Sequence, residues 1–153
     1  MSTTFLQNKE TIALDIGASK EQDLSPYFYR VIAICPDTRE CLEISSVTLC
    51  PYAVFSQKAS LFLGVKQSTQ GLFYQGLKEK KDHPDDSQIP ALTLKEIIHD
   101  WVYQEEDISE RSIACIRCDV GGSEEHFLED LFYFAYFNRC SLLVSFYPDR
   151  WEK

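Results

Sequence analysis

Two apolar runs that stop at an aspartate and turn almost directly onto glycine constrain the fold of this chain most strongly. The first run is IALDIGAS at residues 12–19, and the second is IACIRCDVGG at residues 113–122. Strands of a parallel sheet are buried on both faces, and open α/β sheets bind ligands beyond the carboxyl ends of their strands. Asp15 and Asp119 are therefore the first candidates for site residues.

The size and net charge of the chain predict a single domain and exclude some classes of binding partner. The chain has 153 residues, enough for one domain with its own core, and 24 acidic against 15 basic side chains give a net charge of −9. Such a surface repels phosphate backbones and anionic lipid, which argues against nucleic acid and membrane as partners. The start, MSTTFLQNKE, lacks the basic and then apolar layout of a secretory signal, so we expect a cytoplasmic protein.

The six cysteines are predicted to be free thiols, because a cytoplasmic protein is kept reduced. One close pair, Cys115 and Cys118, lies inside an expected strand, where residues three apart point to opposite faces and cannot share a metal. We therefore predict no metal site.

Strands and helices are expected to alternate along the chain. The first helix is predicted to be short, because Pro26 interrupts it, and Thr93 with Glu96 forms a capping box that starts a clear amphipathic helix. Ser123 is placed to cap a last helix. Strands are expected at 11–14, 30–34, 47–49, 112–118 and 141–146, a hairpin-like excursion from residue 52, and a mobile polar loop at 75–90.

The last helix, EEHFLEDLFYFAYF, is apolar on most of its sides, so its aromatic residues cannot all face one sheet. SLLVSF at 141–146 is expected to be the final strand, with nothing after it to cover its edge. Because exposed apolar edges tend to pair, we predict a homo-oligomer or a protein partner along this strand and the aromatic helix.

The order of these segments resembles the FkbM-type methyltransferases. The resemblance covers residues 12–151 and is carried by ALDIGAS, VIAICPD, PYAVFSQKASLFL, PALTLKEII, IRCDVGGSEEHFLEDL and SFYPDRW. It implies an α/β fold of the Rossmann-like, class I methyltransferase type, with a mostly parallel sheet, here truncated after the fifth core strand. It also implies S-adenosylmethionine as cofactor and O-methylation of a sugar or another small molecule as the reaction.

The same resemblance assigns roles in cofactor binding. It places Asp15, Gly17, Ala18 and Ser19 against the amino acid portion of the cofactor, where Asp15 accepts from its ammonium group and Gly17 admits the backbone close to the ligand. The alternative is that Asp15 and Gly17 only end a strand in a turn. Larger residues follow at 20–22, where the family has a further glycine.

The end of the second strand departs from the family. An acid that holds both ribose hydroxyls is expected there, but this chain has Cys35, which is followed by Pro36. Asp37 is a possible substitute, although Asp37 and Glu40 also fit an ordinary helix start.

The fourth-strand motif supplies the candidate catalytic residues, Asp119 and Glu124, while Gly121 replaces a carboxylate of the family pattern. Asp119 would orient or deprotonate an acceptor hydroxyl. Glu124 is equally explained by the helix dipole, which favours acids in a first turn, and His126 is either a base or a satisfied surface histidine.

Three functions follow from these observations. The first is a methyltransferase that acts on a small-molecule acceptor, and the second is an inactive methyltransferase-fold interaction module, which the departures from the family pattern favour. The third, a nucleotide-binding domain for another ligand, lacks both a G-x-G-x-x-G loop and a P-loop.

Overall fold

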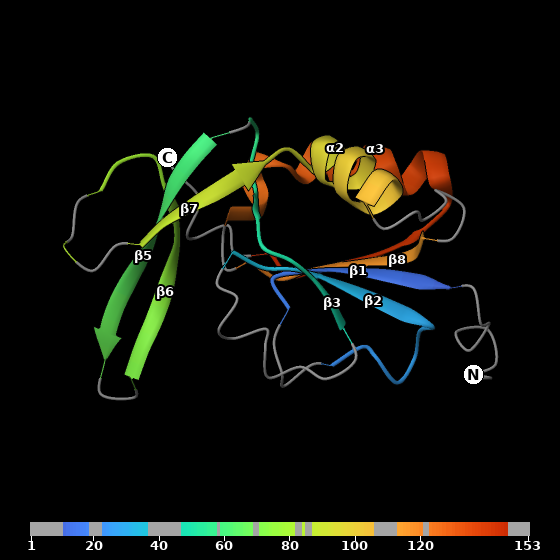
Figure 1. Ribbon diagram of the computed structural model, residues 1–153, viewed down its shortest axis with the longest axis horizontal. Helices are drawn as coiled ribbons and strands as arrows, with labels where there is room; N and C mark the ends of the chain where they lie inside the picture. Colours follow the sequence, from blue (N-terminus) through green and yellow to red (C-terminus); the bar gives the residue numbers. More distant parts are fainter. Residues whose placement is uncertain are drawn as a thin grey trace.

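A five-stranded parallel sheet with a helical layer on one face forms the centre of the protein, and a second, smaller sheet stands beside it (Figure 1). The computed structural model describes residues 11–18, 23–36, 47–57, 59–68, 71–81, 84, 87–105, 113–120 and 123–146. Predictions for Ser19, Asp37 and Gly121 lie outside the described residues.

The central sheet has the strand order β3-β2-β1-β8-β9, and all four pairings are parallel. Its strands are β1 (Ile12–Ile16), β2 (Arg30–Ile34), β3 (Val47–Cys50), β8 (Ile113–Cys118) and β9 (Ser141–Val144). The chain leaves β1 toward one side, builds β2 and β3, and returns on the other side as β8. The expected α/β class with a mostly parallel sheet is confirmed.

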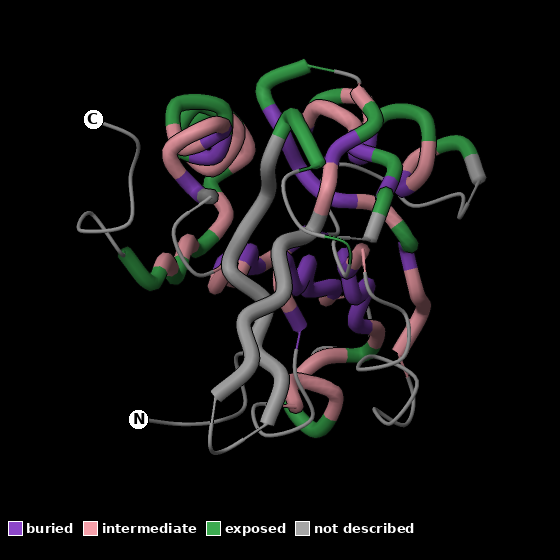
Figure 2. Tube along the Cα trace, turned by 90° about the vertical axis from the view of Figure 1, so that its left-hand side faces the viewer, coloured by how far each residue is buried: buried purple, intermediate pink, exposed green. Residues whose placement is uncertain are grey.

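Both faces of the three inner strands are buried, as the continuous apolar runs predict (Figure 2). Leu14, Ile32 and Ile116 belong to the cluster beneath the helices. Ala13 and Cys115 lie in a cluster on the opposite face, where Phe28 of the segment before β2 packs against them. That segment forms turns in its described part, 23–29, where a short helix was expected.

The helix predicted at Thr93 is confirmed. The Thr93 hydroxyl accepts from the Glu96 N–H at 3.1 Å, and the Thr93 N–H donates to the Glu96 carboxylate at 2.9 Å. The helix runs through α2 (Leu94–Glu96) and continues as a π-helical segment, η3 (Ile97–Glu105). Its apolar stripe faces the sheet as expected; the fully buried members are Leu94, Ile97, Ile98 and Val102.

A continuous last helix was predicted to begin at Ser123. In the structure this segment is broken at Phe127. A 3₁₀ turn, η5 (Ser123–His126), precedes α3 (Leu128–Asn138), and between them Phe127 has φ −143° and inserts into the core. Burial of this ring overrides the capping signal at Ser123. Arg139 ends α3 in the left-handed conformation, with φ 51°.

The second sheet has the order β4-β7-β5-β6, with a parallel β4–β7 pair and antiparallel neighbours otherwise. Its strands are β4 (Ala53–Val54), β5 (Ala59–Ser68), β6 (Gly71–Lys78) and β7 (Ser87–Leu92). The polar loop predicted at 75–90 is therefore wrong at both ends, where strands β6 and β7 occupy its first and last residues. Strand β7 lies between β4 and β5 and contains Pro90, which normally argues against an inner strand, and β6 contains two glycines, so the local sequence did not predict either strand.

Candidate functional site

The neighbouring carboxyl ends of β1 and β8 form the candidate site. Past the last strand residues, the Asp119 N–H donates to the Ile16 carbonyl and the Gly17 N–H donates to the Ile34 carbonyl, both at 2.9 Å. Three strand ends are thus joined at one edge, where the chain order reverses between β1 and β8. In open α/β sheets this reversal opens a crevice for ligands.

Gly17 is required at this edge by the approach of a neighbouring backbone. Its φ is +79°, and a Cβ built on it would collide with the carbonyl oxygen of Asp119. Gly17 thus admits the backbone at the end of β8, an approach that the sequence did not predict, while the close approach of a ligand stays a prediction.

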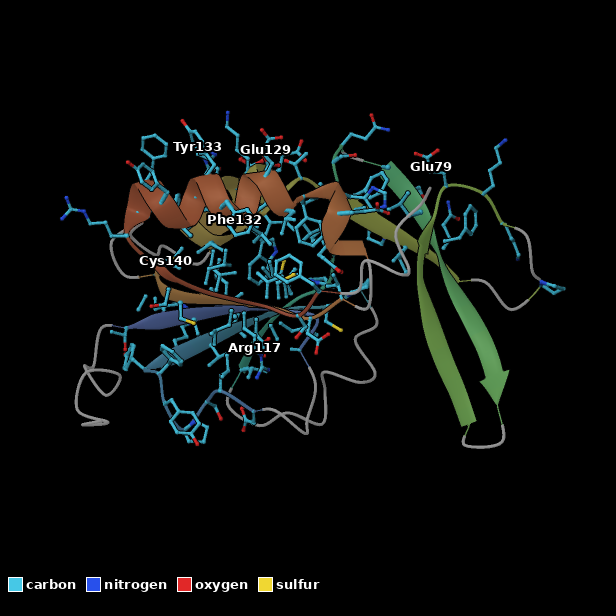
Figure 3. All side chains as sticks on the ribbon, turned by 180° about the vertical axis from the view of Figure 1, so that it is seen from behind. Glu79, Arg117, Glu129, Phe132, Tyr133 and Cys140 are labelled. Carbon is cyan, nitrogen blue, oxygen red and sulfur yellow. The ribbon has the colours of Figure 1, made fainter. Side chains whose placement is uncertain are left out.

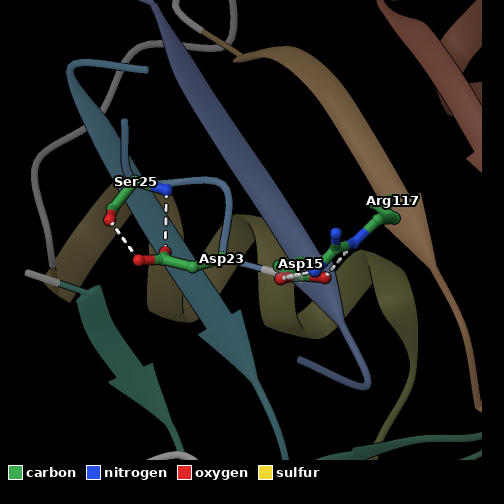
Figure 4. Close-up of polar contacts among 4 residues, drawn as sticks. All are labelled: Asp15, Asp23, Ser25 and Arg117. Atoms are coloured by element: carbon green, nitrogen blue, oxygen red, sulfur yellow. Dashed lines mark hydrogen bonds and ion pairs between the residues drawn. The ribbon is translucent and has the colours of Figure 1, made fainter. Parts of the chain in front are cut away.

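Asp15 lies beside the end of β1 and is engaged by the protein itself. Its register partner on β8 is Arg117, whose Nε donates to Oδ1 at 2.9 Å and whose Nη2 donates to Oδ2 at 2.6 Å (Figure 4). The side chains are only 3% and 14% exposed. A bidentate guanidinium engages both carboxylate oxygens, and because Asp15 is almost completely buried, little of it is accessible to a ligand ammonium.

Burial dominates the titration of Asp15. Desolvation raises its pKa above the ordinary value, against the opposing hydrogen bond and charge of Arg117, and the nearby charges of Asp119 and Asp23 act in the same direction as burial. The two aspartates are 104 positions apart in the sequence, and the hydrogen bond from the Asp119 N–H to the Ile16 carbonyl brings Asp119 next to the residue that follows Asp15.

At the end of β2, the structure places Cys35 inside an apolar cluster. Cys35 is 5% exposed and Ala18 is 3% exposed; they pack with Ala33, Val47 and Leu49. Pro36 is half-buried at the same edge. No carboxylate stands at this position, and the thiol that replaces it is a weak hydrogen-bonding group inside the protein.

The two candidate catalytic residues occupy different environments. Asp119 is half-buried at the edge, whereas Glu124 in η5 is completely buried. Burial, and then the charge of Glu124, raises the pKa of the Cys118 thiol far above its ordinary value, so Glu124 lies near the inner, helix-covered face of β8. The structure therefore brings Asp119 together with Gly17 at the edge, whereas Glu124 is buried in the interior.

His126 connects η5 to the second sheet. Its ring lies 4.5 Å from the ring of Phe55, centroid to centroid, and its Nε2 lies 3.7 Å from a carboxylate oxygen of Glu125. This packing agrees with the interpretation of His126 as a satisfied histidine.

The residue that the sequence interpretation missed is Arg117. An arginine between buried positions of an inner strand needs a carboxylate on the same face, and Asp15 was the one acid in an equally buried strand. That pairing of single charges in two adjacent strands was the available signal.

The described cysteines form no disulfide bond. Cys35, Cys50, Cys115, Cys118 and Cys140 are all free thiols. Cys115 and Cys118 point to opposite faces of the sheet, as expected. Across the described ranges, no three His, Cys, Asp or Glu side chains gather in a way that could hold a metal ion, and none of the helices there is long and apolar enough to cross a membrane.

A groove of about 450 Å³ lies elsewhere, between the α2–η3 helix and α3. It is lined by Leu94, Lys95, Ile98, His99, Tyr103, Asp130, Tyr133, Phe134 and Asn138. None of the predicted site residues contributes to it.

Comparisons with known proteins add no relative: no family model, no curated protein and no solved structure matches this chain.

Proposed function

We propose that this chain is a Rossmann-like domain of the methyltransferase type, which binds S-adenosylmethionine at the β1–β8 edge and methylates a hydroxyl of a small molecule or sugar. The observation that carries the proposal is the reversal of chain order between β1 and β8. Numbered in chain order, the five strands run 3-2-1-4-5, the arrangement with which nucleotide-binding Rossmann sheets begin. The methyl donor and the reaction rest on the FkbM resemblance.

The residues at this edge fit the cofactor only in part. Asp119 is a partly exposed carboxylate at a strand end, so it can accept a hydrogen bond from an ammonium or from an acceptor hydroxyl. Asp15 is occupied by Arg117, and Cys35 offers no acceptor for a ribose. We therefore assign ligand contact to Asp119 among the described residues. Asp15 stabilises the edge through its ion pair with Arg117, which joins β1 to β8.

A second candidate function is an inactive interaction module built on the same fold. The bidentate Asp15–Arg117 pair and the buried Cys35 favour it, because each removes a polar group that the cofactor would need. The two candidates share the fold and differ in whether the edge binds a ligand.

Calorimetric and thermal-shift titration of the full chain with S-adenosylmethionine and S-adenosylhomocysteine separates them. We expect saturable binding that raises the melting temperature, because a ligand that binds only the folded state stabilises it. Asp119→Asn should weaken binding about tenfold or more, since it removes the negative charge that strengthens a hydrogen bond to the ligand.

Asp130→Asn is the matched control, because Asp130 is an exposed aspartate of α3 that lines the α2–α3 groove. It should leave the affinity unchanged. No response up to millimolar ligand would contradict the proposal and leave the inactive module.

A further inference from the structure

The outward side of α3 carries a second apolar stripe in addition to the one that packs on the sheet. Leu131 on the inner side is fully buried, while Phe132, Tyr133, Tyr136 and Phe137 are 51%, 66%, 79% and 62% exposed. The rings of Tyr133 and Phe137 lie 4.4 Å apart and those of Tyr136 and Phe137 5.3 Å apart, so the aromatic side chains form one packed surface. Large exposed aromatic patches of this kind mark interaction sites.

One edge of this surface faces away from α2. Asp130, Phe134 and Asn138 line the groove toward α2, and a rotation of about 100° per residue places Phe132 and Tyr136 on the other side of α3. Figure 3 looks onto that side and shows Phe132 in front of the helix, above the β8–β9 edge of the sheet.

Four residues at spacings of three, four and three form a line along this side: Glu129, Phe132, Tyr136 and Arg139. All four are exposed. Glu129, Phe132 and Tyr136 have the spacing of a helix–helix seam, and Arg139 follows as the C-cap residue of α3. The two aromatic residues therefore lie between an acid at one end of the helix and a base at the other.

The line is complementary to itself when it is reversed. If a second copy of α3 packs antiparallel about a twofold axis at position 134, Phe132 meets Tyr136 of the second copy. Glu129 then meets Arg139 of the second copy, and the same contacts occur again by symmetry. Both ends are thus charge-matched, and the centre is apolar on both copies.

The edge strand β9 lies below α3 on the same side of the molecule (Figure 2). In the described part of the chain its one strand neighbour is β8, and Leu143 and Phe146 are 57% and 48% exposed. With Phe132 and Tyr136 of the line they expose roughly 470 Å², at about 200 Å² for each large side chain. A standard stable interface buries about 800 Å² per partner, so these four side chains supply more than half of the area that a dimer needs.

From this self-complementarity we propose that the chain forms a twofold-symmetric homodimer, in which the α3 lines of two copies pack antiparallel over their adjacent β9 edges. The dimer is independent of cofactor binding, because neither Asp119 nor Gly17 belongs to the interface.

Sedimentation equilibrium and light scattering of the full chain test the proposal without any ligand. We expect a mass twice the 17.7 kDa of one chain at micromolar concentration. Replacing both central aromatics, Phe132→Asp with Tyr136→Asp, should give a folded monomer, whereas Tyr29→Ser, which removes an equally exposed aromatic elsewhere, should leave the dimer intact.

Charge reversal tests the antiparallel arrangement itself. Glu129→Arg alone and Arg139→Glu alone should each weaken self-association about tenfold, because two attractive contacts become repulsive. An equimolar mixture of these two variants should form a heterodimer of wild-type strength, since opposite charges then meet at both ends. A helix weakened by either substitution would not recover on mixing.

If the wild-type protein is still a monomer at about 100 µM, the proposal is overturned. A dimer that survives the double aspartate variant, or single variants whose mixture associates no better than either alone, would overturn it as well.

Discussion

The β1–β8 pair and the outer side of α3 each reverse the usual distribution of side chains, but in opposite ways. Between the strands, a charged pair, Asp15 and Arg117, is buried in the sheet. On α3, aromatic residues such as Tyr136 and Phe137 face outward. The buried charges find complete partners within the chain, whereas the exposed aromatics find only each other in the described part.

This difference separates a region that serves the fold from the region that we propose for association. The Asp15–Arg117 pair and Gly17 hold two strand ends together, and their removal should be felt by the folded chain alone. The α3 surface contributes little to the core, so its changes should be felt by association.

Breaking the buried ion pair should cost the most. Asp15→Leu leaves the Arg117 guanidinium without its carboxylate in the sheet, and we expect a loss of about 3–5 kcal/mol in the free energy of unfolding, measured in urea. The double variant Asp15→Leu with Arg117→Met should recover most of this loss, because well-packed apolar side chains replace a buried pair at little cost.

Asp23→Asn is the control for that experiment. Asp23 accepts from the Ser25 N–H at 2.9 Å and from the Ser25 hydroxyl at 2.7 Å, a local contact in a partly exposed turn (Figure 4). Its loss should cost about 1 kcal/mol or less. If Asp15→Leu and Asp23→Asn lower the unfolding free energy equally, the buried pair contributes no more to stability than a local turn contact.

Gly17→Ala should be the next most damaging change. The new methyl group would be forced into a left-handed conformation and against the Asp119 carbonyl oxygen, so we expect a loss of roughly 2–4 kcal/mol. Thermal unfolding measures it. A melting temperature within error of the wild type would mean that the β1 and β8 ends are not in contact.

The pH dependence of stability should carry the signature of Asp15. Because its pKa is raised on folding, the folded state binds a proton at Asp15 more tightly than the unfolded state does. The stabilising contribution of this group is therefore complete below its ordinary pKa and is lost as the pH rises through the folded value. As the pH falls from neutral to acid, the unfolding free energy of the wild type should therefore increase relative to that of Asp15→Asn. A difference that is constant with pH would contradict a raised pKa.

Changes on the outer side of α3 should have the smallest effect on the fold. Phe132→Ser should alter the unfolding free energy of the isolated monomer by about 0.5 kcal/mol or less, because the residue lies outside the core. Leu131→Ala, one position away on the buried side, should cost about 2–5 kcal/mol. Similar losses for both variants in chemical unfolding would show that the two sides of α3 are not distinct.

Much of the fold could be predicted from the sequence because its signals are local. The inner strands read as apolar runs, and the capping box at Thr93 and Glu96 marks a helix start by hydrogen bonds three residues apart. The second sheet was predicted only as a hairpin-like excursion, since β7 pairs with β4 and β5, about thirty residues earlier in the chain, and its Pro90 argues against an inner strand.

The candidate site could be located but not resolved from the sequence. Strand ends at Gly17 and Asp119 identify an edge, but whether Asp15 faces a ligand or Arg117 depends on the register between strands about a hundred residues apart. Likewise, no local pattern separated the buried Glu124 from the half-buried Asp119. Burial at these positions is a property of the packed structure.

Ligand mapping by amide chemical shifts tests the central claim, that the β1–β8 edge is a cofactor site, most directly. On titration of the labelled protein with S-adenosylhomocysteine, we predict the largest shifts at Gly17, Ala18, Cys35 and Val120, around the ends of β1, β2 and β8. Shifts confined to the α2–α3 groove, around His99 and Asn138, or the absence of any shift at millimolar ligand, would contradict the claim.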